Sequence, residues 1–138
     1  MRDWVKNLVE QVSGWPGVTC HDHRFGGVEF RVGTREIGHA HNFGIVDIPF
    51  TVKIRDALIG VGKARRHHWL PDSGWTTVRV KEQEFETACI LLRLSYLRFQ
   101  TKSSEPVTAR QAQGELESLK IEPEVLAAAG IAVPAVEA

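Results

Sequence analysis

Residues 33–50 read Gly33-Thr-Arg-Glu-Ile-Gly-His39-Ala-His41-Asn-Phe-Gly-Ile-Val-Asp47-Ile-Pro49-Phe50, and this stretch decides the fold. A second polar stretch, residues 67–75, reads His67-His68-Trp-Leu-Pro-Asp72-Ser73-Gly74-Trp75. All six histidines of the chain fall into three pairs, at positions 21 and 23, 39 and 41, and 67 and 68. Three histidine pairs in one region predict a single polar site in a compact domain.

Alternation identifies residues 35–43 as a strand, because neighbouring side chains in a strand point to opposite faces. One face is expected to carry Ile37, His39, His41 and Phe43, and the other Glu36, Gly38, Ala40 and Asn42. The two histidines therefore lie on the face with the large apolar groups. Buried imidazole nitrogens need hydrogen-bond partners, so we expect the site on this face.

Length and composition indicate one ordinary globular domain. The chain has 138 residues, of which 43% are hydrophobic and 25% are charged, enough for one core. No apolar run has the length of a membrane span, and the N-terminus lacks a secretory signal, so we expect a cytoplasmic protein without membrane contacts. Cys20 and Cys89 form no CxxC pattern and predict no disulfide framework.

The net charge of zero combines a basic part with an acidic end. Residues 1–102 hold 15 lysines and arginines against 11 acidic residues, a balance of +4, and residues 103–138 hold 2 against 6, a balance of −4. We therefore predict a domain over 1–102 and an acidic, alanine-rich tail over 103–138 that is partly helical or disordered. From about residue 123 we expect loose packing or disorder.

Periodicity predicts the remaining elements. Helical spacing favours helices over 3–13, from Pro49 to about 62, over 83–100 and from about 103 to 119, with Pro49 in the first turn of the second helix. A period of two favours strands over 18–25, 28–32 and 75–81. Short hairpin connections favour antiparallel pairing. The expected fold class is α+β, a single mostly antiparallel sheet of about five strands with two or three helices on one face.

The pair His39-x-His41 can supply two metal ligands from one strand face. A third ligand can come from His67, His68, His21, His23 or Asp47. Three such ligands plus water suit zinc or non-haem iron, and we take His39, His41 and His68 as the candidate metal ligands. The run Gly33-(x5)-His39-x-His41 also matches the opening of the cupin motif, but positions 45 and 46 are Ile and Val where cupins place a glutamate.

The same residues support acid/base chemistry without a metal. A neutral imidazole in a half-apolar pocket can take a proton from a bound ligand near neutral pH, and Asp47 or Glu36 can orient it. The candidate catalytic residues are His39, His41, Asp47 and His68, and the candidate substrate-binding residues are Glu36, Asp72, Ser73 and Trp75. Ser73 lacks the G-x-S-x-G surroundings of a hydrolase nucleophile, which favours a turn serine.

Two further interpretations stay open. Histidines on sheet faces are often core residues with satisfied nitrogens, and Trp69 and Trp75 often serve packing alone. The chain can also be a non-catalytic binding or regulatory module, because the segment 53–66 carries five basic residues against one acidic residue and can bind phosphate or nucleic acid. No nucleic-acid-binding motif accompanies it, so nucleic acid is the weaker partner and a small-molecule ligand the stronger one. The basic residues are Lys53, Arg55, Lys63, Arg65 and Arg66.

Six blocks recur in the order of a known family. They are Gly14-Trp-Pro-Gly-Val18, Glu29-Phe-Arg-Val-Gly33, Arg35-Glu-Ile-Gly-His-Ala-His41, Asp47-Ile-Pro-Phe50, His67-His68 and Pro71-Asp-Ser-Gly-Trp75. These blocks resemble small bacterial proteins of the luciferase family, also called the luciferase domain, which includes the fungal luciferase. The resemblance covers roughly residues 13–98, and the end after residue 100 lies outside it.

The resemblance implies a small-molecule oxygenase or oxidoreductase with a histidine-lined pocket. The fungal enzyme is an oxygenase that acts on a hydroxylated pyrone without a known bound cofactor. A second, weaker resemblance, through Gly14-Trp15 and Leu94-Ser95-Tyr96, is to the MmcQ/YjbR-like proteins, for which DNA binding has been proposed. The family positions implied by the first resemblance are His39, His41, Asp47, His68, Asp72 and Trp75, without an assigned catalytic role.

Overall fold

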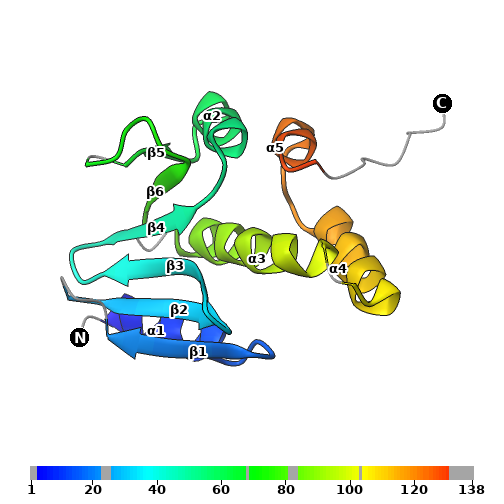
Figure 1. The fold of residues 1–138 in the computed structure, drawn as a ribbon. Helices are drawn as coiled ribbons and strands as arrows, with labels where there is room; N and C mark the ends of the chain where they lie inside the picture. Colours follow the sequence, from blue (N-terminus) through cyan, green and yellow to red (C-terminus); the bar gives the residue numbers. More distant parts are fainter. Residues whose placement is uncertain (1–2, 23–25, 68, 81–83, 103, 131–138) are drawn as a thin grey trace.

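The structure, a computed structural model, describes residues 3–22, 26–67, 69–80, 84–102 and 104–130. Within these residues six strands form one sheet of order β1-β2-β3-β4-β6-β5, in which every neighbouring pair is antiparallel (Figure 1). The predicted α+β class with a single antiparallel sheet is confirmed. The strands are β1 Val18–Asp22, β2 Val28–Val32, β3 Arg35–His41, β4 Ile45–Pro49, β5 Arg65–Arg66 and β6 Trp75–Arg79.

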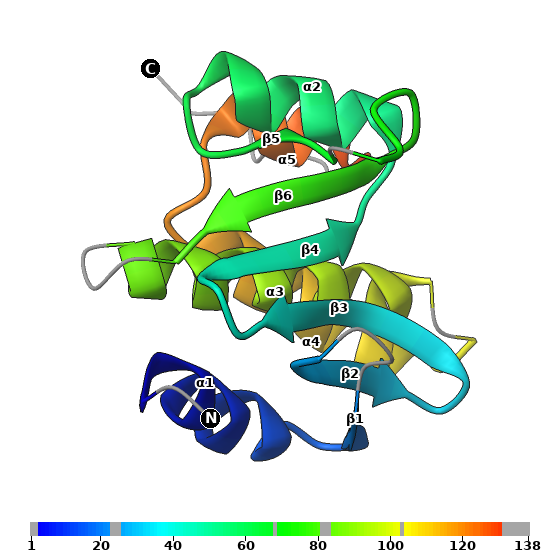
Figure 2. The same cartoon turned by 90° about the vertical axis from the view of Figure 1, so that its left-hand side faces the viewer.

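Two helices pack on one face of this sheet, α1 against β1 and β2, and α3 against β3 and β4. Figure 2 shows the sheet from the face opposite α3, which lies behind it. On this face no helix of the described residues lies in front of β3 and β4. One face of the central strands is therefore left open for polar groups. The helices are α1 Asp3–Ser13, α2 Val52–Gly60, α3 Phe85–Thr101, α4 Pro106–Ser118 and α5 Pro123–Ala128.

The core between the sheet and these helices follows the helical stripes of the sequence. The helix predicted over 3–13 is confirmed, and it buries Val5, Leu8 and Val12 at helical spacing. α3 is buried on most of its surface, as expected for a helix with apolar residues on several faces. Each fully buried leucine stabilises the fold by ~2 kcal/mol relative to an exposed one. Among the described helices, none is long and apolar enough to cross a membrane.

The second helix begins later than predicted. Pro49 does not open it but ends β4, paired with Trp75 of β6. The helix starts at Val52, because the hydroxyl of Thr51 accepts a hydrogen bond from the backbone N–H of Ile54 over 3.2 Å and so provides the N-cap. A proline is tolerated at a strand end, where the missing N–H removes no ladder bond that the sheet needs.

Three strands differ from their predicted limits, and one of them, predicted over 75–81, ends at Arg79. The strand predicted over 35–43 ends at His41, because Gly44 donates its backbone N–H to the carbonyl oxygen of His41 and closes a turn. Phe43 therefore lies in this turn. The strand predicted over 18–25 runs over 18–22, and residues 23–25 lie outside the described residues.

The described residues 104–130 pack more closely than expected. α4 packs on α3, and α5 packs on α2. We expected loose packing from about residue 123, but Val125 is fully buried and Leu126 is 6% exposed. The sequence does not show that α5 packs against the apolar stripe of α2. The residue pattern of α5 alone therefore predicts less burial than the structure has. The division into 1–102 and 103–138 stays a prediction, and residues 131–138 lie outside the described residues.

Candidate functional site

A row of three polar residues on neighbouring strands forms the base of the site. His39 of β3 is paired with Asp47 of β4, and Asp47 is paired with Thr77 of β6. Residues directly opposite each other in antiparallel strands point to the same face. This is the open face, because a Cβ atom at the preceding Gly38 would lie 2.6 Å from Leu92 of α3, on the helix-covered side.

A β-bulge in β3 brings Glu36 to the same face. β2 pairs Phe30 with Gly38 and Arg31 with Glu36, so Ile37 is the extra residue of the bulge. An extra residue interrupts the alternation of side chains. Glu36 Oε2 therefore lies 2.7 Å from His39 Nδ1, while Ile37 is fully buried in the core. This corrects the predicted faces, which placed Ile37 beside the histidines and Glu36 opposite them.

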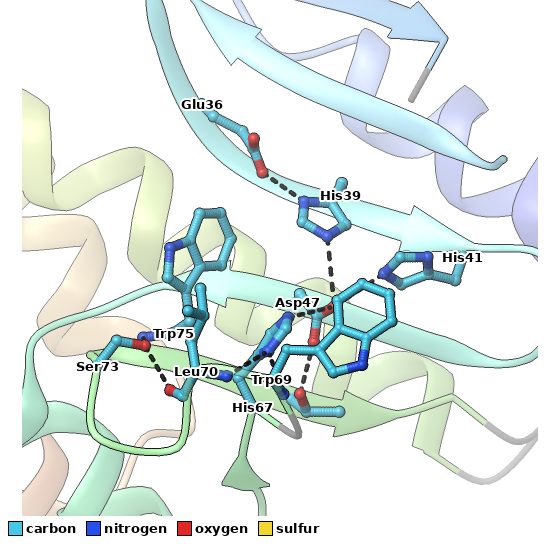
Figure 3. A network of polar contacts seen from close by, with 10 residues as sticks. Glu36, His39, His41, Asp47, His67, Trp69, Leu70, Ser73 and Trp75 are labelled. Carbon is cyan, nitrogen blue, oxygen red and sulfur yellow. Dashed lines mark hydrogen bonds and ion pairs between the residues drawn. The ribbon is translucent and has the colours of Figure 1, made fainter. Parts of the chain in front are cut away.

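Asp47 is the centre of the site and is completely buried. Thr77 donates its hydroxyl to Asp47 Oδ1 over 2.5 Å. The nearest ring nitrogens of His41, His39 and His67 lie 2.8, 3.3 and 3.4 Å from Asp47 Oδ2 (Figure 3). Burial alone would raise the pKa of Asp47, but hydrogen bonds from His39, Thr77 and His41 outweigh it and lower the pKa to about 2. The carboxylate is therefore ionised at neutral pH.

His39 lies between two carboxylates. Its Nδ1 faces Glu36, and its Nε2 faces Asp47. Burial alone would lower the pKa of His39, but its hydrogen bonds to Asp47 and Glu36 raise the pKa to about 9. Burial raises the pKa of Glu36 against the opposing bond from His39. The ring of His39 is therefore doubly protonated at neutral pH and donates one N–H to each carboxylate.

His67 is held in one tautomer by the backbone of its own loop. Its Nδ1 accepts the backbone N–H of Trp69 over 3.2 Å and that of Leu70 over 3.3 Å. A ring nitrogen that accepts hydrogen bonds carries no proton, so the proton of the neutral ring is on Nε2. Nε2 is the nitrogen that faces Asp47, and it donates to this carboxylate.

The loop that presents His67 is anchored by a buried arginine of α2. Arg55 is 3% exposed, and its Nη1 donates to the carbonyl oxygens of Pro71 and Ser73 over 2.8 and 2.5 Å. Asp56 accepts from the other side of the same guanidinium over 2.8 Å. These bonds tie Pro71 and Ser73 of the loop to α2 through the planar guanidinium.

The other end of this loop is fixed by close packing and by a serine. A Cβ atom at Gly74 would lie 1.8 Å from the carbonyl oxygen of Phe50, so only glycine fits there. Ser73 donates its hydroxyl to the carbonyl oxygen of Leu70 and accepts the backbone N–H of Trp75. The hydroxyl of Ser73 thus stabilises a turn, in agreement with the turn serine that its sequence surroundings favour.

Aromatic and apolar side chains surround the three imidazoles. Phe43 and Trp69 are 65% and 66% exposed, and Leu70 is 49% exposed. Large apolar groups gathered at the surface are typical of a binding site. The ring pairs, with the distances between their centroids, are His39–Trp75 at 5.3 Å, His41–Phe43 at 5.1 Å and His67–Trp69 at 6.2 Å. We call Phe43, Trp69, Leu70 and Trp75 the aromatic rim.

The structure brings several predicted site residues together. His39, His41 and Asp47 form one cluster, with Glu36 and Trp75 beside it. His68 lies outside the described residues, and its neighbour His67, which the sequence offers as one of several third ligands, reaches Asp47. The catalytic and binding roles of all these residues stay predictions.

Other predicted positions lie away from the carboxylate. Asp72 is exposed in the loop. His21 is exposed on β1 and hydrogen-bonded to Thr19, so the three histidine pairs do not form one site. β1 is separated from β3 by β2, a distance of about 10 Å across the sheet. His23 lies outside the described residues.

The basic segment 53–66 is less available than its composition indicates. Arg55 is buried under the loop, and Lys63 forms an ion pair with Glu122 over 2.8 Å. Lys53, Arg65 and Arg66 are exposed. A nucleic-acid partner for this segment stays a prediction.

Two residues of the site do not stand out in the sequence. Alternation within the strand predicted over 75–81 indicates which residues share a face with Thr77, but it does not mark Thr77 as a site residue. Only the pairing of β6 with β4 puts Thr77 opposite Asp47. Arg55 resembles one more cation on a solvated helix face, and no local pattern distinguishes it from Lys53.

The cluster can hold a metal ion. One ligand atom each of His39, His41 and Asp47 lies within 4.8 Å of the others, and all three side chains are buried. Two imidazoles and a carboxylate are a donor set that transition metals accept.

Comparison with protein families matches residues 34–95 to the Luciferase domain. Comparisons with curated proteins and with solved structures give no significant match. The similarity to MmcQ/YjbR-like proteins stays a prediction. The matched segment runs from the start of β3 into α3 and includes the whole cluster, its loop and the anchoring Arg55. Residues 34–95 of this chain are thus similar to the Luciferase domain.

Proposed function

We propose that this domain is a small-molecule enzyme of the oxygenase type, with its reaction at the cluster of His39, His41 and Asp47. The observation that carries the proposal is the convergence of three imidazoles on one fully buried carboxylate. Burying an ionised group costs several kcal/mol before its partners offset the loss. Such clusters are typical of functional sites, where they are retained for chemistry at some cost in stability.

The exposed fractions of Asp47 and of the three histidines suggest different roles for the carboxylate and the imidazoles. Asp47 is 0% exposed, whereas His39, His41 and His67 are 7%, 6% and 7% exposed. Asp47 therefore cannot touch a substrate, and it acts by orienting the rings. The imidazole edges are the groups that a bound molecule meets, and the aromatic rim supplies apolar contact around them.

This arrangement suits a substrate with an acidic hydroxyl or carbon. An imidazole oriented by a carboxylate can accept that proton near neutral pH, and we assign this role to His41, because both nitrogens of His39 carry protons and those of His67 are engaged by the loop backbone and Asp47. The resulting anion is electron-rich, and dioxygen, the second substrate, is the oxidant of the reaction. The resemblance to the fungal luciferase, an oxygenase of a hydroxylated pyrone, supports the same reaction class.

Oxygen consumption by the full chain tests this proposal. The first probe is a hydroxylated pyrone, followed by a panel of small enolic and phenolic compounds. We expect uptake with the wild type and a loss of at least ~100-fold in His39→Gln and His41→Gln, the size of effect typical of acid/base groups. His21→Ala is the matched control, because it removes an exposed histidine outside the site. Equal uptake in the two cluster variants contradicts the proposal.

A further inference from the structure

We propose that the cluster is a metal site of the two-histidine, one-carboxylate kind, in which His39 Nε2, His41 Nε2 and the carboxylate of Asp47 bind one divalent transition-metal ion and His67 does not. The inference rests on the proposed function only in placing the reaction at this same cluster. Its own basis is the position of each donor atom and the hydrogen bond that each side chain makes on its far side.

The two nitrogen donors converge on one oxygen of the third ligand. The Nε2 atoms of His41 and His39 lie 2.8 and 3.3 Å from the same oxygen, Asp47 Oδ2. The rings of the two histidines are nearly perpendicular, at 87°, with 4.8 Å between their centroids. Ligands at ~2.1 Å from a shared ion lie up to about 4 Å apart, so small side-chain rotations are enough to admit the ion.

The far side of His39 has the partner that a metal ligand needs. A ligating histidine usually donates its other N–H to a carboxylate, which fixes the ring and strengthens its basicity. Glu36 Oε2 occupies this position, 2.7 Å from His39 Nδ1. Metal binding replaces the proton that Nε2 shares with Asp47, as it does at any histidine ligand.

Asp47 is oriented in the same way. The hydroxyl of Thr77 donates to Oδ1, and this bond leaves Oδ2 directed toward the two imidazoles. Hydrogen-bonded carboxylates of this kind are usual among metal ligands. Both halves of the carboxylate therefore have a defined task.

His67 has the opposite arrangement and is excluded for that reason. Its Nδ1 accepts two backbone N–H groups, so its proton is on Nε2, the atom that faces the cluster. At His39 a metal can replace the Nε2 proton because Nδ1 keeps its own proton toward Glu36. At His67 the same replacement would leave an imidazolate anion with no proton on either nitrogen, so its Nε2 offers no lone pair to a metal. His67 is therefore a positioning residue that donates to Asp47, and the ion has three protein ligands.

The donor set selects the class of ion. Two imidazoles and one carboxylate suit iron(II), zinc, cobalt(II) or manganese(II), whereas magnesium and calcium prefer oxygen ligands. Three protein ligands leave coordination positions for water or substrate, and iron(II) in such a site supplies the redox chemistry of oxygenases.

Metal titration of the full chain, without a histidine tag, tests the assignment. The probe is cobalt(II) added to chelator-treated protein, read by its visible spectrum and by metal analysis after gel filtration. We expect one ion per chain in the wild type, a loss of at least ~100-fold in affinity in His39→Ala and His41→Ala, and a loss of ~10-fold or more in Glu36→Gln, as for other outer partners of metal ligands.

The decisive variant is His67→Asn. The amide oxygen of asparagine can take the place of Nδ1 and accept the loop N–H groups, while no atom reaches the cluster. We expect cobalt affinity within about threefold of the wild type, as for the control His21→Ala. If His67→Asn loses the ion as His39→Ala does, the three-ligand assignment is overturned.

Absence of one-to-one cobalt binding by the folded wild type overturns the metal site as a whole. Circular dichroism shows whether each variant folds. If His39→Ala does not fold, the cobalt affinity of Glu36→Gln still tests the site. Metal content and oxygen uptake are separate readings. One bound ion without oxygen uptake contradicts only the proposed function, whereas oxygen uptake without bound metal contradicts only the metal site.

Discussion

The guanidinium of Arg55 donates to the carbonyl oxygen of Pro71 over 2.8 Å, and this bond ties helix α2 to the loop that presents His67. The same nitrogen also reaches the carbonyl oxygen of Ser73. Because Arg55 is buried and its Nη1 donates to two backbone carbonyl groups of the loop, it acts on the site through the loop. A residue that composition marks as a surface cation is thus a structural link.

Replacing Arg55 is expected to loosen this loop. Arg55→Met leaves two carbonyl groups without their donor, and each such group costs ~1–3 kcal/mol. We expect a loss of ~2–4 kcal/mol in the free energy of unfolding from urea denaturation, together with faster hydrogen exchange at the N–H groups of Trp69 and Leu70. Arg55→Lys should lose less, because it keeps a donor.

The matched control is Lys53→Met, which removes an exposed cation from the same helix. It should change stability by less than about 0.5 kcal/mol. Equal effects of the Arg55 and Lys53 substitutions would show that the loop does not depend on the guanidinium.

Gly74→Ala is expected to disturb the loop from its other end. The new methyl group would meet the carbonyl oxygen of Phe50 at 1.8 Å, and a backbone atom cannot give way as a side chain can. We expect a loss of ~2–4 kcal/mol in thermal or urea unfolding, within the range for overpacked or strained positions. Gly60→Ala is the control, since nothing lies within 4 Å of its added Cβ at the end of α2, and it should be neutral or stabilising.

Thr77→Val tests the orientation of Asp47. The substitution keeps the shape of the side chain and removes the hydroxyl that donates to Oδ1. A hydrogen bond to a charged group contributes about 1.5–3 kcal/mol, and we expect a loss of this size in unfolding free energy. Thr76→Val, on the neighbouring residue whose hydroxyl donates to the carbonyl oxygen of Gly74, should cost less because that acceptor is neutral. Similar losses in both variants would argue against a special role for Thr77.

The pH dependence of the free energy of unfolding, measured with a chelator present, should reveal the raised pKa of His39. Folding raises the pKa of His39 from 6.5 to about 9, so its stabilising effect is complete below pH 6.5 and is lost as the pH rises through 9. Folding lowers the pKa of Asp47 from 3.8 to about 2, so that contribution is present above pH 3.8 and is lost as the pH falls through 2. The highest stability is expected between about pH 4 and 6.5.

The alkaline loss from His39 should be about 3 kcal/mol, because each unit of pKa corresponds to about 1.4 kcal/mol. It is not added to the acidic effect, since the two residues share one hydrogen bond. His39→Gln should lack this alkaline decline when its urea unfolding is compared with the wild type from pH 6 to pH 10. An unchanged decline in the variant would assign it to other groups.

Much of the site is predictable from local patterns. Alternation along β3 puts His39 and His41 on one face, and Asp47, an acidic residue of the same stretch, is a candidate partner. Glu36 is assigned to the wrong face by that reasoning, because the bulge at Ile37 depends on how β3 pairs with β2. An extra residue in one strand is invisible until both strands are aligned.

The sequence by itself determined the α+β class, the amphipathic helix over 3–13 and the HxH face, because each depends on a period that a single element carries. The tertiary structure alone decided that Glu36 joins His39, that His67 donates to Asp47, and that Arg55 is buried. These contacts join residues from different elements, and their energies depend on strand register and loop closure rather than on any local pattern.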